Sequence, residues 1–136
     1  MLDTCVISEL VKPQPNVELV DWCGRQNEES LFLSSITIGE IQKGISKLPP
    51  SERKKTLQNW LDTDLLDRFG DRIIGIDTKV ARMWGEIQAA TEKTGLKMPV
   101  IDSLIASSGL VYDLTIVTRN VQDMQASGVR LLNPWK

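Results

Sequence analysis

Short apolar runs alternate with longer segments of helical periodicity along the whole chain, and this alternation restricts the fold more than any other feature. It predicts an α/β sandwich with a mainly parallel sheet of four to five strands flanked by helices. The predicted strands span residues 2–7, 30–34, 72–76, 114–118 and 129–132, the first of them ending near Asp3 or Thr4. The predicted helices begin after Pro15 and at Thr37, Ser51, Thr78 and Pro99.

Helical spacing also predicts which side chains face the core. Val17, Val20 and Cys23 recur on one face of the first predicted helix, so that face is expected to be buried. The helix over residues 78–93 is expected to stop before Gly95, because glycine readily adopts the left-handed backbone conformation found at helix ends.

The length of 136 residues and the lack of a linker or internal repeat predict one domain over residues 1–136. No apolar run is long enough to span a bilayer, and the first residues lack the features of a secretory signal. Cys5 and Cys23 are interpreted as reduced thiols, since nothing else suggests a disulfide scaffold. A cytoplasmic protein without membrane attachment is therefore expected.

Histidine is absent, and this absence removes His-based acid–base catalysis, Ser-His and Cys-His nucleophile pairs, and nearly every catalytic zinc site. The net charge of −2 gives no overall attraction to a polyanion. If the protein is an enzyme, carboxylates are the side chains expected to carry its chemistry. Binding of nucleic acid would then rest on a local basic patch or on metal ions.

Asp3 and Asp102 are charged residues in otherwise apolar segments. An unpaired carboxylate in a buried strand, such as Asp3, is costly unless it is hydrogen-bonded, paired or metal-bound. Asp102 is the only charged residue between Met98 and Tyr112, in a helix that is apolar on nearly all sides. Asp3 could instead cap the following turn, and Asp102 could interact with a helix dipole for ~0.3–1 kcal/mol. A bound cation explains Asp102 better, because this gain is small beside the cost of burying a charge.

Two further polar groups lie near predicted strand ends. Glu40 could close a capping box with Thr37, or it could lie beside the edge of the sheet. Thr118 and Asn120 follow the predicted strand 114–118 and are expected at the same edge as Asp3, because ligands bind at the carboxyl ends of parallel strands. Asp123 could simply cap the short helix after this turn.

Four motifs, in order, resemble a known family: Leu2-Asp3-Thr4, Thr37-x-x-Glu40, Asp102-x-x-Ile105-Ala106 and Thr118-Arg119-Asn120-x-x-Asp123. This order resembles the PIN domain, a three-layer α/β sandwich, and in particular the VapC-type toxins of toxin–antitoxin pairs. Residues 6–10 and 13–16, with the ending Asn133-Pro134-Trp135, are similar to the FitB-like branch. The resemblance covers essentially the whole chain.

The resemblance implies an endoribonuclease that depends on Mg²⁺ or Mn²⁺. Asp3, Glu40 and Asp102 match the three core acids of the family and are expected to hold the ion. Hard cations of this kind prefer oxygen ligands and can activate a water and stabilise charge on a phosphate. The other site residues are expected to be Asn120 and Asp123 in the catalytic site, Thr4 and Thr118 behind the acids, and Arg119 and Lys43 on the RNA backbone.

The resemblance also implies partners. Proteins of this type are generally homodimers inhibited by a small VapB-like antitoxin, which covers the active site and often places an arginine among the acids. RNA is the expected substrate.

Two positions depart from the family pattern. Asn120 stands where the family often has Asp, which lowers the charge expected at a second metal site. Cys5 stands where members usually have Asn, so the hydrogen bonds of that amide are expected to be missing. These departures leave an alternative open, a catalytically degenerate PIN-like module that binds antitoxin or RNA without cleaving.

Overall fold

The computed structural model describes residues 1–135 and has the α/β architecture that the sequence predicts. Eight α-helices lie in this part of the chain: α1 (Thr4–Leu10), α2 (Val17–Gly24), α3 (Ser35–Ser46), α4 (Glu52–Asn59), α5 (Leu66–Phe69), α6 (Thr78–Lys93), α7 (Val100–Val111) and α8 (Val121–Met124). A π-helical segment, η2 (Trp60–Leu65), joins α4 to α5. The four strands are β1 (Leu33–Ser34), β2 (Ile73–Ile74), β3 (Ile116–Val117) and β4 (Leu131–Leu132).

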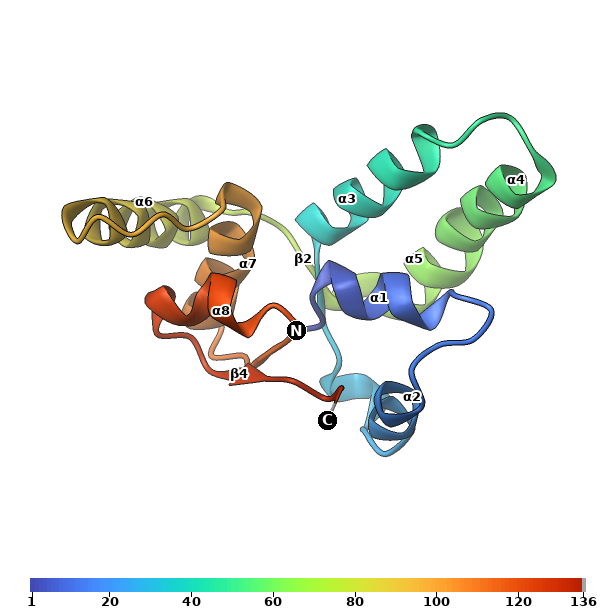
Figure 1. Cartoon of the computed structure of the whole chain (residues 1–136), viewed down its shortest axis with the longest axis horizontal. Coiled ribbons are helices and arrows are strands. Elements are labelled where there is room, and N and C mark those ends of the chain that lie inside the picture. Colours follow the sequence, from blue (N-terminus) through green and yellow to red (C-terminus); the bar gives the residue numbers. More distant parts are fainter. Residues whose placement is uncertain (136) are drawn as a thin grey trace.

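The helices form two groups around the short strands. Figure 1 shows α6, α7 and α8 on one side, and α1, α3, α4 and α5 on the other. The N-terminus lies between the two groups. Within residues 1–135, no helix combines the length and the apolar character needed to cross a bilayer.

All strand pairing is parallel, as predicted, but the strands are much shorter than predicted. β1 pairs with β2, and β3 pairs with β4, as two separate ladders. The first residues join these ladders: Leu2 donates from its backbone N to Phe32 O at 2.8 Å, and Asp3 N donates to Val117 O at 2.9 Å. Val117 N in turn donates to Met1 O at 2.8 Å. Residues 1–3 are therefore the seam between the two halves of the sheet.

The predicted strand over residues 2–7 is wrong beyond its first residues. Leu2 forms a single bridge to Val117, and α1 begins at Thr4. Asp3 caps this helix, because its carboxylate accepts from Thr4 N at 2.8 Å. Val6 and Ile7 are buried, as expected, but as one face of a helix. A short apolar run alone does not distinguish a buried strand from a buried helical turn.

The long helices agree well with the sequence pattern. α6 has the predicted bounds, and its N-cap Asp77 accepts from Val80 N at 2.9 Å. Gly95 follows it with a φ of +76°, the left-handed conformation expected after a helix end. Ser51 caps α4 as predicted, accepting from Lys54 N at 3.1 Å.

Two hydrophobic clusters fill the two halves. One packs α1, α3 and η2 together around β1, and the other packs α6 and α7 against β3. The predicted buried face of α2 is wrong, because Val17 and Val20 are 67% and 42% exposed. Leu19 is fully buried instead, with Trp22 and Cys23 against the first cluster. A helix of eight residues that ends in Gly24 carries too few turns for its spacing to fix a face.

Gly109 marks the closest approach of α7 to the strands. A methyl group added there would lie 2.8 Å from Ile116 Cδ1 and from Val129 Cγ2, and 3.1 Å from Leu114 O. Only a residue without a Cβ lets α7 pack at this distance. This packing sets the position of the helix that carries Asp102.

Candidate active site

Asp3 is 3% exposed and lies where the seam of residues 1–3 meets α1. Its Oδ1 accepts from Thr4 N, and its Oδ2 accepts from the buried hydroxyl of Thr118 at 2.7 Å. Thr118 in turn accepts from Asn120 N at 2.9 Å. No basic side chain within residues 1–135 forms an ion pair with Asp3. The predicted edge of the sheet thus brings Asp3 and the Thr118 turn together.

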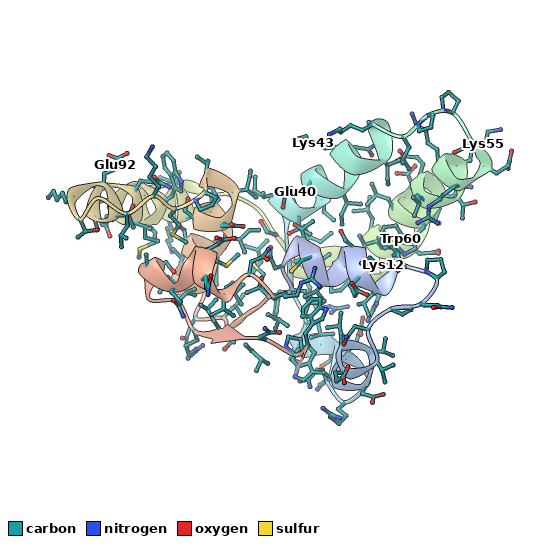
Figure 2. The ribbon with its side chains drawn as sticks, in the orientation of Figure 1. Lys12, Glu40, Lys43, Lys55, Trp60 and Glu92 are labelled. Carbon is teal, nitrogen blue, oxygen red and sulfur yellow. The ribbon has the colours of Figure 1, made fainter. Side chains whose placement is uncertain are left out.

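Glu40 lies on the part of α3 that faces the middle of the molecule (Figure 2). Its Oε1 accepts from the Thr4 hydroxyl at 2.5 Å, and that hydroxyl also lies 3.1 Å from the hydroxyl of Thr37. The capping-box alternative is wrong, because α3 begins two residues before Thr37 and is capped by Ser34. Glu40 is therefore free of the helix terminus and is held toward Asp3 by Thr4.

Asp102 lies in the first turn of α7 and is partly buried. Burial raises the pKa of this carboxyl to about 6, and the nearby charges of Asp3, Asp123 and Glu40 contribute in the same direction. Four carboxylates from different parts of the chain thus share one electrostatic field. An ordinary helix N-terminal aspartate would instead have its charged form favoured.

Asn120 and Asp123 lie on the turn after β3 and on α8. Asn120 precedes α8, and its backbone O accepts from Asp123 N at 3.1 Å. The capping alternative for Asp123 is wrong, because Asp123 lies inside α8 and makes no cap hydrogen bond. Its exposed carboxylate acts on Asp102 through charge.

Cys5 is directed toward the same acids. Its Sγ lies 3.7 Å from Asp3 Oδ2 and 3.5 Å from Thr118 Oγ1. Burial raises the pKa of the Cys5 thiol, which keeps its proton available to Asp3. Two weak thiol contacts thus stand in place of the amide hydrogen bonds expected from asparagine.

The two residues expected on RNA backbone are both exposed. Arg119 follows Thr118 directly, and its guanidinium lies 5.1 Å from the centre of the Trp135 ring, within range of a cation–π contact. Lys43 lies about one turn beyond Glu40 on α3 (Figure 2).

The donor set fits a hard divalent cation. All four clustered side chains offer carboxylate oxygens, and no lysine or arginine of residues 1–135 neutralises any of them through an ion pair. Within the same residues, no three His, Cys, Asp or Glu side chains converge closely enough to hold an ion entirely by themselves. Mg²⁺ commonly keeps several waters and uses only one or two carboxylates, so its binding does not require three side chains to converge.

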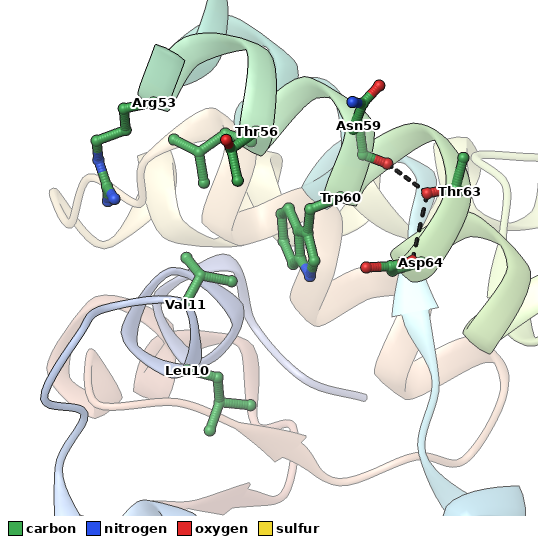
Figure 3. Close-up of a pocket in the computed structure, with 9 residues that line it drawn as sticks. Leu10, Val11, Arg53, Thr56, Asn59, Trp60, Thr63 and Asp64 are labelled. Atoms are coloured by element: carbon green, nitrogen blue, oxygen red, sulfur yellow. Dashed lines mark hydrogen bonds between the residues drawn. The ribbon is translucent and has the colours of Figure 1, made fainter.

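A groove between α1 and the α4–η2 helix was not predicted. Hollows of about 570, 260 and 230 Å³ adjoin here, and all three are lined by Val11 and Trp60. Figure 3 shows Trp60 opposite Val11, with Arg53 toward one end. Glu40 lines the second hollow, so the groove reaches the acids. The sequence signal was the apolar periodicity of residues 57–69, which core packing explained equally well.

Several known proteins are similar to this chain over nearly its whole length. A family model described as the PIN domain matches residues 1–125. Plasmid stability protein StbB of Pseudomonas syringae is 34% identical over 100% of this chain and 98% of its own length. VapC ribonuclease Y4jK of Sinorhizobium fredii is 30% identical over 100% of this chain and 97% of its own length. Toxin FitB of Neisseria gonorrhoeae is 33% identical over 99% and 97%.

Solved structures agree. The crystal structure of FitAcB from Neisseria gonorrhoeae has a TM-score of 0.94 at 34% identity, covering 98% of this chain and 96% of that one. VapBC2 from Rickettsia felis, solved with a DNA fragment from its promoter, has a TM-score of 0.81 at 28% identity, covering 98% and 96%. Both similarities extend over the helices and strands that carry the four acids.

Proposed function

Because this chain belongs to the PIN-domain family, and within it to the VapC and FitB toxins, we propose that it is the ribonuclease toxin of a toxin–antitoxin pair. The proposed reaction is hydrolysis of RNA phosphodiester bonds with Mg²⁺ or Mn²⁺ at the clustered acids.

One observation carries the proposal. Burial raises the pKa of Asp102, and the charges of Asp3, Asp123 and Glu40, which come from separate elements, raise it further. Like charges gathered without cationic side chains destabilise the fold, and such clusters are typical of functional sites. A divalent cation is the partner that best matches an all-oxygen set.

The side chains have distinct proposed roles. Among Asp3, Asp102 and Glu40, one or two carboxylates would bind the ion directly and the rest through water, and the ion would supply Lewis-acid stabilisation of charge on the phosphate. Asp3 is fixed for this role by Thr4 N and the Thr118 hydroxyl. Glu40, fixed by Thr4, is also placed to orient the attacking water and to accept its proton. Asn120 and Asp123 complete the polar wall on the α8 side.

Cleavage of single-stranded RNA, with and without EDTA, tests this function. The expected result is cleavage that EDTA abolishes and that added Mg²⁺ or Mn²⁺ restores. Asp3→Asn and Asp102→Asn should each abolish cleavage while the circular dichroism spectrum stays unchanged. Asp113→Asn is the matched control, because this exposed aspartate lies outside the cluster. Full activity in either site variant would refute the assignment.

Asn120 and Cys5 depart from the family pattern, and they therefore favour a second candidate function. In this alternative the protein is a module that binds RNA or antitoxin without cleaving RNA. Calorimetric titration with Mn²⁺ separates it from the enzyme. The enzyme should bind the ion and cleave, whereas the degenerate module should bind RNA and leave it intact at every metal concentration.

The proposed protein partner is a VapB-like antitoxin that occupies the groove between α1 and the α4–η2 helix. The hollow that Glu40 lines is mainly apolar, with Val11, Ile41 and Trp60 in its lining, and an amphipathic helix binds such a groove through its apolar face. Because Glu40 lines one end, an arginine from the same partner would meet unneutralised carboxylates. Trp60→Ala should weaken binding of co-expressed antitoxin at least tenfold and leave cleavage by free toxin intact.

A homodimer is the remaining part of the proposal and rests on the resemblance alone. Light scattering during gel filtration measures it directly, and a monomer mass at micromolar concentration would count against it.

A further inference from the structure

Another hollow, separate from the groove between α1 and the α4–η2 helix, lies on the α8 side of the molecule. It is open to solvent, has a volume of about 430 Å³, and is lined by Arg119, Asn120, Val121, Gln122, Asp123, Gln125 and Asn133. This volume is within the range of small-molecule sites. Its lining is unusual for such a site, because most of these side chains are amides.

These amides are largely free of partners in residues 1–135. The side chains of Asn120, Gln122 and Gln125 form no hydrogen bond, and Asn133 uses only its Oδ1, which accepts from Trp135 N at 2.9 Å. An amide offers donors and an acceptor side by side. That pairing matches the hydrogen-bonding edge of a nucleobase, which proteins read with Asn and Gln.

The hollow shares two residues with the proposed catalytic site. Asn120 and Asp123 line it, and the charge of Asp123 also acts on Asp102. A group bound in the hollow is therefore a near neighbour of a phosphate bound at the acids.

Arg119 gives the hollow a positive side. Its guanidinium lies 5.1 Å from the centre of the Trp135 ring, and this cation–π contact restricts the exposed side chain. The charges of Arg119 and Asp123 balance, which favours an uncharged ligand over a free cation or an acidic peptide. The sugar-phosphate part of a nucleotide would meet Arg119.

We infer that this hollow binds one unpaired base next to the cleaved phosphate and reads its identity through Gln122, Gln125 and Asn133. The inference rests on the proposed ribonuclease function and adds a source of sequence preference to it. Recognition of bases in single strands is the usual way in which proteins read RNA sequence.

The test uses a library of single-stranded RNA with randomised positions, in two separate measurements. Cleaved products are sequenced at their 5′ ends in Mg²⁺, and bound RNA is sequenced after selection by the same protein in EDTA. The proteins are wild type, the Gln122→Ala/Gln125→Ala double variant, and Asn133→Asp, which keeps the acceptor for Trp135 N. Gln14→Ala is the matched control, as an exposed glutamine elsewhere on the surface.

The wild type is expected to prefer one base at one position beside the cut. The double variant and Asn133→Asp should reduce that preference about tenfold at this position and leave the other positions unchanged, whereas Gln14→Ala should match wild type. Identical preferences in all proteins, or a uniform loss at every position, would overturn the inference. Base preference in binding without any cleavage would support the inference that the hollow binds a base and would refute the proposed nuclease function. Neither binding nor cleavage would refute both.

Discussion

The hydroxyl of Thr4 donates to the carboxylate of Glu40 across 36 positions of sequence, at 2.5 Å. This contact joins the first turn of α1 to α3, and the same residue's backbone N binds Asp3. One threonine therefore orients two of the acids. Its side chain fixes Glu40, and its main chain fixes Asp3.

Thr4→Val should lower the rate of RNA cleavage with little loss of folding stability. A hydrogen bond to a charged group contributes ~1.5–3 kcal/mol, so the loss in kcat is expected to be ~10-fold and at most ~100-fold. Thr4→Ser, which keeps the hydroxyl, should restore most of the activity. Equal kcat values for Val and Ser variants with intact thermal unfolding would exclude this role for the hydroxyl.

Asp102→Asn should stabilise the metal-free protein above pH 6. The folded pKa of Asp102, about 6, is above its ordinary value of 3.8, so the folded state binds more protons than the unfolded state between these values. Stability from the neutral carboxyl is complete below pH ~3.8 and is lost as pH rises through 6. Since the group is partly solvated, we expect a gain of ~1 kcal/mol, or ~3–5 °C in Tm, at pH 7.5.

The measurement is thermal unfolding in EDTA at pH 4.5 and pH 7.5. The difference between Asp102→Asn and wild type should be small at the lower pH. Added Mg²⁺ should raise the Tm of wild type and leave the variant unchanged, because only binding to the folded state stabilises it. A variant that is less stable than wild type in EDTA at pH 7.5 would contradict the electrostatic account of this cluster.

Arg119→Gln should weaken RNA binding and reduce its salt dependence. Loss of one phosphate contact on a single strand lowers the slope of log Kd against log salt by ~0.7. The affinity of wild type and variant is compared from 50 to 200 mM salt. Arg130→Gln is the control, because Arg130 pairs with Asp113. An unchanged slope for Arg119→Gln would place the RNA backbone elsewhere.

Gly109→Ala should destabilise the fold, although alanine is the better helix former by ~1 kcal/mol. The added methyl would lie 2.8 Å from Ile116 Cδ1 and Val129 Cγ2, and such overpacking costs ~1–3 kcal/mol. Gly85→Ala in α6 meets no atom within 4 Å and should stabilise by up to ~1 kcal/mol. Urea unfolding of both variants checks the opposite signs, and a stabilised Gly109→Ala would show that α7 can move away from the strands.

Long periodic elements could be read directly from the sequence. The bounds of α6 and the cap at Ser51 depend on local preferences, which the printed residues contain. The strand lengths could not be predicted from the sequence, because the pairing of two or three residues depends on which segments of the chain lie side by side in the fold. Val17 and Val20 were placed inward by spacing alone, whereas the docking of α2 through Leu19 and Trp22 decides their exposure.

Two of the acids can be identified from the sequence because each is an unusual residue in its setting. Asp3 and Asp102 stand out as charges among apolar neighbours, and that signal is local. Glu40 has no such signal, and its alternative as a helix cap is excluded only by the start of α3 at Ser35, with Ser34 as its cap. The groove at Trp60 and the amide hollow depend on contacts between distant segments. No periodicity encodes them.

The seam formed by residues 1–3 has a mechanical consequence. Glu40 stands on the side of one hydrophobic cluster and Asp102 on the side of the other, with Asp3 between them. The distances between the acids therefore depend on how the two hydrophobic clusters are positioned relative to residues 1–3. A small shift at this seam would misalign the acids while the packing within each cluster stayed intact.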